Sequence, residues 1–142
     1  MKIEECLTEA ELSRAFPVIQ ELRPSFTETQ YLSLINTMQN EGYRVFIGLL
    51  NDKPVSYAGI LIRTNLYDLK HIWVDDLVTI DSARSKGCGL KMIQFLEELA
   101  QQENCQHISL SSGFQRIDAH RFYLEKGGFE KCSYQFRKKI SP

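Results

Sequence analysis

The fold of this protein is indicated most clearly by residues 74–99, which read VDDLVTIDSARSKGCGLKMIQFLEEL. A strand-like run passes through a turn with Gly87 and Gly89 and continues directly into an amphipathic helix. The first turn of a helix leaves backbone N–H groups without partners, and the helix dipole makes that end positive. Glycines allow a ligand to approach the backbone, and Arg84 and Lys86 add two cationic side chains. The segment therefore predicts a site for an anionic diphosphate.

Two familiar nucleotide-binding motifs do not fit this turn. A P-loop requires the pattern GxxxxGK[ST], which the chain lacks, and the dinucleotide fingerprint GxGxxG would need glycine where Met92 stands. The chain instead has, directly after a strand-like run, Arg84-Ser85-Lys86-Gly87-Cys88-Gly89. This spacing resembles motif A of the GNAT superfamily, the acyl-CoA-dependent N-acetyltransferases, whose signature is Q/R-x-x-G-x-G/A.

Hydrophobic spacing and capping patterns predict the elements around this segment. Thr8 and Thr27 each begin a capping-box pattern that leads into an amphipathic helix. Apolar runs at 43–50 and 55–64, joined by the turn composition of residues 51–54, predict an antiparallel hairpin. The other expected elements are strands at 2–6, 70–80, 107–111 and 129–140 and helices at 90–104 and 118–126. The order β-α-α-β-β-β-α-β-α-β predicts an α/β fold, an α+β mixed sheet with helices on both faces.

The resemblance to the GNAT superfamily extends beyond the turn. Residues 76–79 stand where the family has an acidic residue leading an apolar strand, and residues 119–129 resemble its A-x-x-F-Y-x-x-x-G-F segment. Within the superfamily, residues 116–123 and the C-terminal SYQFRKKI look most like the aminoalkylphosphonate N-acetyltransferases. The similarity is clear over residues 43–140. It implies a single N-acetyltransferase domain, residues 1–142, with a central and partly splayed sheet.

Length and composition set the class of protein. A chain of 142 residues with 43% hydrophobic and 25% charged residues is typical of one globular domain. The net charge of −1 argues against a general nucleic-acid-binding field, and no apolar run approaches the roughly 18 residues of a membrane-spanning helix. The cysteines and histidines show neither CxxC nor metal-ligand spacing, so we expect no metal site. We expect a protein of a reducing compartment, the cytoplasm, without a nucleic-acid or membrane partner.

The resemblance implies acetyl-CoA as cosubstrate and assigns its binding to two neighbouring segments. Loop amides would hold the pyrophosphate, and Arg84 would support the loop or meet a phosphate. Where the fourth strand splays from the fifth, its free backbone groups would pair with the pantetheine arm, and an amide there would polarise the thioester carbonyl. The implied acetyl-CoA-binding residues are Leu77, Val78, Thr79, Arg84, Ser85, Lys86, Gly87, Cys88 and Gly89.

Two residues are the catalytic candidates for proton transfer. An alkylammonium with a pKa of about 10.4 must lose a proton before it attacks the acetyl group, and Asp76, or a water that it positions, would accept that proton. Asp76 would alternatively hold the positive charge of the substrate. Tyr123 matches the family's general acid and would protonate the departing CoA thiolate, while His120, one helical turn earlier, is an alternative base or substrate contact. Residues 109–112 lack the glutamate that many family members carry in that strand, which leaves the base open.

These features predict an acetyl-CoA-dependent N-acetyltransferase that acts on the primary amine of a small molecule by direct attack in a ternary complex. Two alternatives stay open: a non-catalytic acyl-CoA-binding sensor on the same fold, and a protein or peptide N-acetyltransferase. The final strand also offers an edge through which a homodimer would form.

The sequence gives two conflicting indications of the substrate's charge. A cationic substrate is favoured by the acidic residues Asp68, Asp75 and Asp76. The phosphonate-like resemblance would instead require a basic anchor, for which the candidates are Arg63, Arg116 and Arg121.

Overall fold

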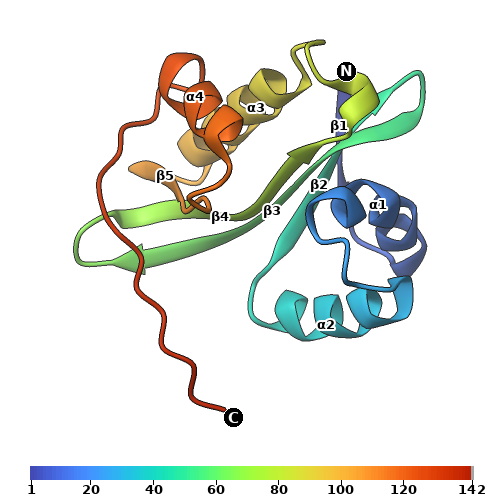
Figure 1. Cartoon of the computed structure of the whole chain (residues 1–142), viewed down its shortest axis with the longest axis horizontal. Coiled ribbons are helices and arrows are strands. Elements are labelled where there is room, and N and C mark those ends of the chain that lie inside the picture. The colour runs from blue at the N-terminus through green and yellow to red at the C-terminus, as the bar shows by residue number, and fades with distance from the viewer. Residues whose placement is uncertain (142) are drawn as a thin grey trace. The chain divides into compact units, whose positions relative to one another are not determined.

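The computed structural model describes residues 1–141, which group into two compact units (Figure 1). The first unit, Met1–Leu110, contains β1 (Lys2–Cys6), α1 (Glu9–Leu22), α2 (Glu28–Asn40), β2 (Arg44–Leu50), β3 (Lys53–Asn65), β4 (Leu69–Thr79), α3 (Cys88–Gln102) and β5 (His107–Leu110). The second unit begins at Ser111 and contains α4 (Ile117–Glu125).

The first unit is built on a five-stranded sheet in the order β1-β2-β3-β4-β5. The strands from β1 to β4 pair antiparallel, whereas β5 pairs parallel with β4. A parallel pair needs a long crossover, and α3 supplies it. The predicted mixed α/β architecture is confirmed, as is the element order from the first strand through α4.

The predicted hairpin between β2 and β3 is confirmed, with a tighter turn than the expected four residues. Only Asn51 and Asp52 lie between the strands, and their φ angles are 49° and 63°. Two-residue hairpin turns of this kind need positive φ at both positions, which asparagine and aspartate tolerate better than most residues. The turn residues therefore set the first pair of the hairpin, Leu50 with Lys53, and the register then shifts between Gly48 and Leu49.

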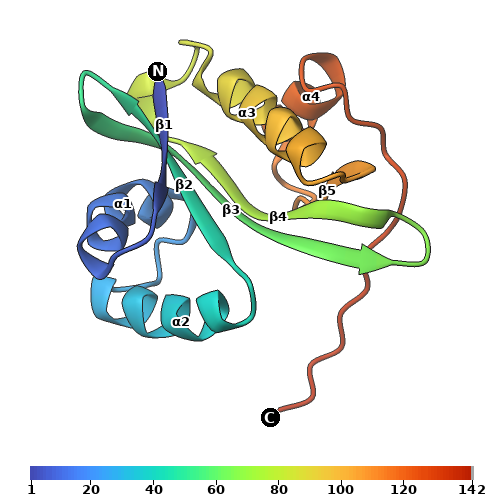
Figure 2. The ribbon, with the colours of Figure 1, turned by 180° about the vertical axis from the view of Figure 1, so that it is seen from behind.

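Helices cover both faces of the sheet in the first unit. α1 and α2 lie on one face and α3 lies on the other, as both views show (Figure 1 and Figure 2). The capping box predicted at Thr27 forms, because its side chain accepts from the backbone of Gln30 and its own N–H donates back to the Gln30 side chain. On α3 the apolar stripe Met92, Ile93 and Leu96 is at most 1% exposed, so burial against the sheet fixes that helix.

The second unit contains the predicted glycine stop after α4. The N–H of Phe129 donates to the carbonyl of Tyr123 at 3.0 Å, and Gly128 adopts a left-handed φ of 75°. A left-handed glycine with such a return bond is a common way to end a helix.

The strand predicted over residues 129–140 is wrong. After α4 the described chain contains no further helix or strand, and Tyr134, Phe136 and Ile140 are 82%, 91% and 88% exposed. Alternating apolar and polar residues make a segment compatible with a strand, but pairing needs a partner edge, and this unit offers only a helix.

Candidate active site

The turn before α3 presents a row of free backbone donors. Within residues 1–141, the amides from Ser85 to Gly89 donate no hydrogen bond, and Gly87 caps α3 without a side-chain partner. Ser85 and Gly87 have φ angles of 67° and 77°, so left-handed residues alternate along the loop. Such alternation turns successive N–H groups toward one side and forms a concave anion site. The helix dipole adds positive potential at the same place.

The loop also has the space and charge that a diphosphate needs. A Cβ built on Gly87 would meet no atom within 4 Å, and the Lys86 side chain is exposed. The Cys88 thiol is buried beside Val55 and Ala83, so only the backbone of that residue faces the loop. Ser85 holds a left-handed conformation that is costly for a residue with a Cβ, as is common at ligand sites. The residues present therefore fit the pyrophosphate of CoA.

Arg84 supports this loop from one end. Its guanidinium donates to the carbonyl of Thr79 at 3.2 Å and to a carboxylate oxygen of Asp81 at 3.1 Å. These bonds tie the last residue of β4 to the turn that precedes α3. The Arg84 guanidinium therefore has partners within this turn, and its role toward acetyl-CoA stays a prediction.

The strand β4 leaves β5 halfway along its length. Pairing between the two runs only from His71 to Val74 on β4, so Leu77, Val78 and Thr79 pair with β3 alone. In a strand with one free edge, alternate N–H and C=O groups point away from the partner and stay available. The predicted splay is therefore confirmed within the first unit, and the free edge leads directly toward the loop.

A β-bulge lies where the two strands separate. Asp76 pairs with Gly59 and Val74 pairs with Ile60, so Asp75 is the extra residue on β4. Bulges bend a strand and redirect its side chains. The two neighbouring aspartates consequently have different partners: Asp75 accepts from the indole N–H of Trp73 at 2.9 Å, whereas Asp76 faces α1 and β2.

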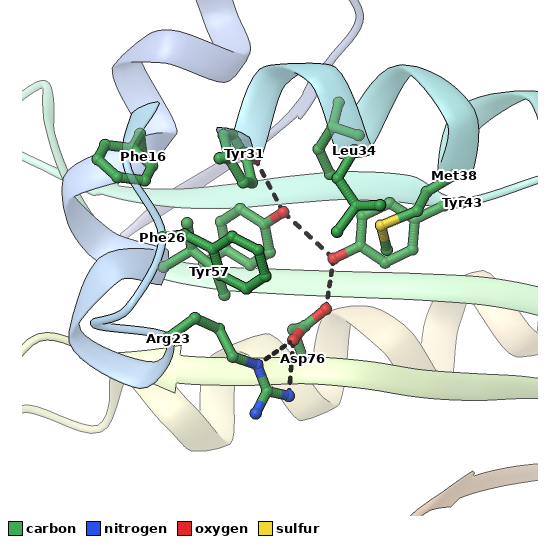
Figure 3. Close-up of a pocket in the computed structure, with 11 residues that line it drawn as sticks. Phe16, Arg23, Phe26, Tyr31, Leu34, Met38, Tyr43, Tyr57 and Asp76 are labelled. Carbon is green, nitrogen blue, oxygen red and sulfur yellow. Dashed lines mark hydrogen bonds and ion pairs between the residues drawn. The ribbon is translucent and has the colours of Figure 1, made fainter. Parts of the chain in front are cut away.

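Asp76 is held by two donors from distant parts of the chain (Figure 3). Its Oδ1 accepts from Nε and Nη2 of Arg23, at 3.1 and 2.9 Å, and its Oδ2 accepts from the hydroxyl of Tyr43 at 2.6 Å. The Asp76 side chain is only 11% exposed, while that of Arg23 is 47% exposed. The carboxylate is thus fixed in direction by its partners.

Three tyrosines form a hydrogen-bonded chain that ends at Asp76. The hydroxyls of Tyr31 and Tyr57 are 2.9 Å apart, and those of Tyr57 and Tyr43 are 3.2 Å apart. Burial raises the pKa of all three tyrosines, so each hydroxyl keeps its proton at neutral pH. We call Tyr31, Tyr57, Tyr43 and Asp76 the tyrosine–aspartate cluster.

The tyrosine–aspartate cluster depends on a glycine in β3. A Cβ on Gly59 would lie 1.6 Å from the hydroxyl oxygen of Tyr43, so only glycine leaves room for Tyr43 to reach Asp76. Sequence reasoning proposed Asp76 but missed the three tyrosines and Arg23. The available signal was Gly59 itself, because a glycine inside a strand pattern often marks a bulge or a close approach.

The second candidate catalytic residue, Tyr123, lies on α4 in the second unit. It is 7% exposed and packs edge-to-face between Phe122 and Phe129, with ring centroids 5.7 and 5.6 Å away. Burial raises the pKa of its hydroxyl, and Arg116 acts weakly in the opposite direction. His120 on the same helix is engaged with the hydroxyl of Ser112 at 3.1 Å.

The other charged candidates have structural partners of their own. Asp68 accepts from the hydroxyl of Ser109 at 2.8 Å, and the Arg63 guanidinium lies 5.5 Å from the ring centre of Trp73. Over residues 1–141 there is no group of three His, Cys, Asp or Glu side chains that could hold a metal ion. No helix in that range is long and apolar enough to cross a membrane.

Comparison with known proteins agrees with this geometry. The model of the acetyltransferase (GNAT) family matches residues 8–129. The uncharacterized N-acetyltransferase YhdJ of Bacillus subtilis is 34% identical over 139 residues, covering 97% of this chain and 98% of that protein. An aminoalkylphosphonate N-acetyltransferase of Salmonella typhimurium is 28% identical over 102 residues, covering 71% of this chain and 64% of that protein.

Solved structures share the fold at lower identity. An aminoglycoside N-acetyltransferase in complex with CoA has a TM-score of 0.84 at 13% identity, covering 98% of this chain and 93% of that one. A Trypanosoma brucei acetyltransferase has a TM-score of 0.69 at 24% identity, covering 98% and 100%. Since the family model spans most of the chain and a relative matches nearly all of it, the chain belongs to the acetyltransferase (GNAT) family and is an acetyl-CoA-dependent N-acetyltransferase.

Proposed function

We propose that this protein transfers the acetyl group of acetyl-CoA to the primary amine of a small molecule by direct attack in a ternary complex. The single observation that carries the proposal is the row of free amides from Ser85 to Gly89, which follows the free stretch of β4 along the chain. The amides would bind the pyrophosphate, while Leu77, Val78 and Thr79 would pair with the pantetheine arm. Arg84 would hold the loop in place, and Lys86 would add a cation near the phosphates.

Asp76 directly precedes the free stretch of β4, which supports a role beside the acceptor amine. The amine nitrogen attacks the acetyl carbonyl carbon, a C–N bond forms, and the C–S bond breaks with its electron pair on sulfur. The nitrogen loses one proton, which Asp76 or a water that it positions accepts. An amide of the free edge would polarise the carbonyl as negative charge develops on its oxygen.

Tyr123 is the proposed donor of the proton that the CoA thiolate takes up. A free thiol has a pKa of about 8.5, so protonating the leaving thiolate helps the intermediate to collapse. Burial raises the pKa of Tyr123, which keeps its hydroxyl protonated and able to donate at neutral pH. His120 would serve as an alternative contact to the substrate.

The test measures acetyl-CoA binding by calorimetry and CoA release with a thiol reagent across a panel of primary amines. We expect Tyr123→Phe to bind acetyl-CoA normally and to lose about a hundredfold in kcat. The matched control is Tyr67→Phe, which removes the same hydroxyl from a tyrosine that is 81% exposed. Absence of acetyl-CoA binding would end the proposal, and binding without turnover on any amine would favour the acyl-CoA sensor.

We also propose that two copies of the chain pair through the segment after α4. Its exposed apolar residues, Tyr134 and Phe136, would leave water on contact with a second copy. Light scattering after size-exclusion chromatography should give twice the 16.4 kDa mass of the chain. A monomer at micromolar concentration would contradict this part of the proposal.

A further inference from the structure

The first unit contains a pocket of about 140 Å³ on the face of the sheet that α1 and α2 cover (Figure 3). Its floor is formed by the tyrosine–aspartate cluster, and its lining also includes Arg23, the exposed Leu34 and the half-buried Met38. Leu34 is 46% exposed, so an apolar side chain stands partly in solvent at the entrance. The pocket therefore has an apolar side chain at its entrance and, on its floor, the carboxylate of Asp76, which directly precedes the free edge of β4.

Each tyrosine hydroxyl on the pocket floor already donates its proton in a hydrogen bond to a neighbour. Tyr43 must donate to the Asp76 carboxylate, so Tyr57 donates to Tyr43 and Tyr31 in turn donates to Tyr57. None of these hydroxyls has a proton left for a ligand. What the pocket offers to an occupant is ring faces and the aliphatic side chains of residues such as Leu34, Ile35 and Met38.

Because the pocket floor has no free donor, it should bind some classes of acceptor molecule better than others. Hydroxyl-rich molecules and anionic groups would lose their water on entry and would find no free hydroxyl donor on the floor to replace it. The one cationic side chain of the lining, Arg23, is already bonded to the Asp76 carboxylate and to the carbonyl of Asp75. An apolar group loses little on leaving water and gains by burial. The pocket volume is close to that of an engineered cavity of about 150 Å³ that binds benzene. One six-membered ring or a short branched chain would therefore fill it.

The Asp76 carboxylate has one lone pair left that can accept a hydrogen bond from an amine. A carboxylate can accept about four hydrogen bonds. Arg23 supplies two and Tyr43 supplies one, so one lone pair is left. Because Asp76 is only 11% exposed and held from two sides, that lone pair has a fixed direction on the floor of the pocket.

We infer that the acceptor is a primary amine on a compact apolar body, an arylalkylamine or a branched alkylamine, with its body in this pocket and its nitrogen at Asp76. The inference rests on the proposed function and narrows its substrate class. It also assigns substrate selection to Leu34 and Met38, which no part of the chemistry of acetyl transfer requires.

The experiment compares phenethylamine, isopentylamine, aminomethylphosphonate and an aminoglycoside as acceptors for the full chain, using CoA release. We expect kcat/KM for the two apolar amines to exceed that for the other two by about tenfold or more. Calorimetric binding of phenethylamine to the protein with CoA present gives a second readout that does not need turnover.

The matched variants are Leu34→Gln and Leu7→Gln. Leu34→Gln should raise KM for phenethylamine about tenfold while leaving KM for acetyl-CoA unchanged. Leu7 is 72% exposed and does not line the pocket, so Leu7→Gln should leave both constants unchanged. Thermal melts would show that both variants are folded.

The outcomes separate this inference from the proposed function. Preference for the phosphonate or the aminoglycoside, or an equal response of all amines to Leu34→Gln, would overturn the apolar-amine inference and leave the acetyltransferase proposal intact. Binding of phenethylamine that Leu34→Gln weakens, without turnover of any amine, would support the pocket and overturn the proposed reaction. If neither phenethylamine nor isopentylamine bound or reacted, the inference would be overturned outright.

Discussion

The 85–89 loop and the tyrosine–aspartate cluster lie in the same unit but are built in opposite ways. The loop uses main-chain N–H groups of five consecutive residues, and its shape depends on left-handed φ angles at Ser85 and Gly87. The cluster uses side chains that come from α2, β3, β4 and the residue directly before β2. One site is local in the chain, and the other exists only when distant segments pack correctly.

This difference shows which substitutions should disrupt each site. A backbone site tolerates changes of side chain wherever φ is preserved, because the donors are present in every residue except proline. A side-chain site fails when one atom is misplaced, because each hydroxyl depends on the next one for its partner. We therefore expect that a substitution in one site will leave the other site unchanged.

The largest expected effect comes from Gly59→Ala, which changes no member of the tyrosine–aspartate cluster. The new Cβ would lie 1.6 Å from the Tyr43 hydroxyl, so the tyrosine must move and lose Asp76. We expect the free energy of unfolding to fall by about 3 kcal/mol, at the upper end for overpacking. Urea unfolding measures this loss.

Gly48→Ala is the matched control for that substitution. Its Cβ would meet chiefly the flexible end of the Met1 side chain, which can move away. We expect a loss below about 1 kcal/mol, within the range of mild repacking. Equal losses for the two glycines would show that the approach of Tyr43 to Gly59 has no special cost.

The next effect, on activity, comes from Asp76→Asn. Removing the charge should lower kcat/KM for the amine about a hundredfold, while the Kd for acetyl-CoA at the backbone site stays the same. Asp75→Asn is the control, since that side chain bonds to Trp73 and not to the cluster. A comparable loss in both variants would contradict the assignment to Asp76.

A smaller effect is expected when the backbone site is changed through Gly87→Ala. The φ of 77° costs a residue with a Cβ roughly 1–2 kcal/mol, and relaxing it would turn the loop amides away from the phosphates. Loss of one bond to a charged phosphate should weaken acetyl-CoA binding about tenfold or more. Calorimetry with acetyl-CoA should detect this, and unchanged binding would argue that the loop amides do not hold the cosubstrate.

The smallest effect concerns pH and the buried tyrosines. The pKa values of these tyrosines are raised in the folded protein. Their contribution to the free energy of unfolding is therefore fully present below the unfolded pKa of about 10 and is lost as pH rises above it. At pH 10 each tyrosine should lower the free energy of unfolding by about 0.4 kcal/mol. Tyr57→Phe should flatten the decline measured by urea unfolding between pH 8 and about 10; an unchanged slope would contradict this origin.

Much of the fold followed from local patterns in the sequence. The capping box at Thr27, the turn composition of residues 51–54 and the apolar stripe of α3 each predicted an element that the structure contains. These signals are local because helices and tight turns are set by neighbouring residues. The segment at 129–140 failed as a strand for the complementary reason: its alternating pattern gives no information about whether a partner edge exists.

The sequence by itself determined the 85–89 loop, the helix behind it and the strand that carries Asp76, because these lie within one continuous stretch of chain. Only the tertiary structure decided that Arg23 and Tyr43 hold Asp76, that Tyr57 and Tyr31 continue the chain of hydrogen bonds, and that Gly59 leaves room for Tyr43. The physical reason is that backbone donors are placed by local φ and ψ angles. Side-chain partners that come from separate helices and strands are placed by how those elements pack, and no single residue determines that packing.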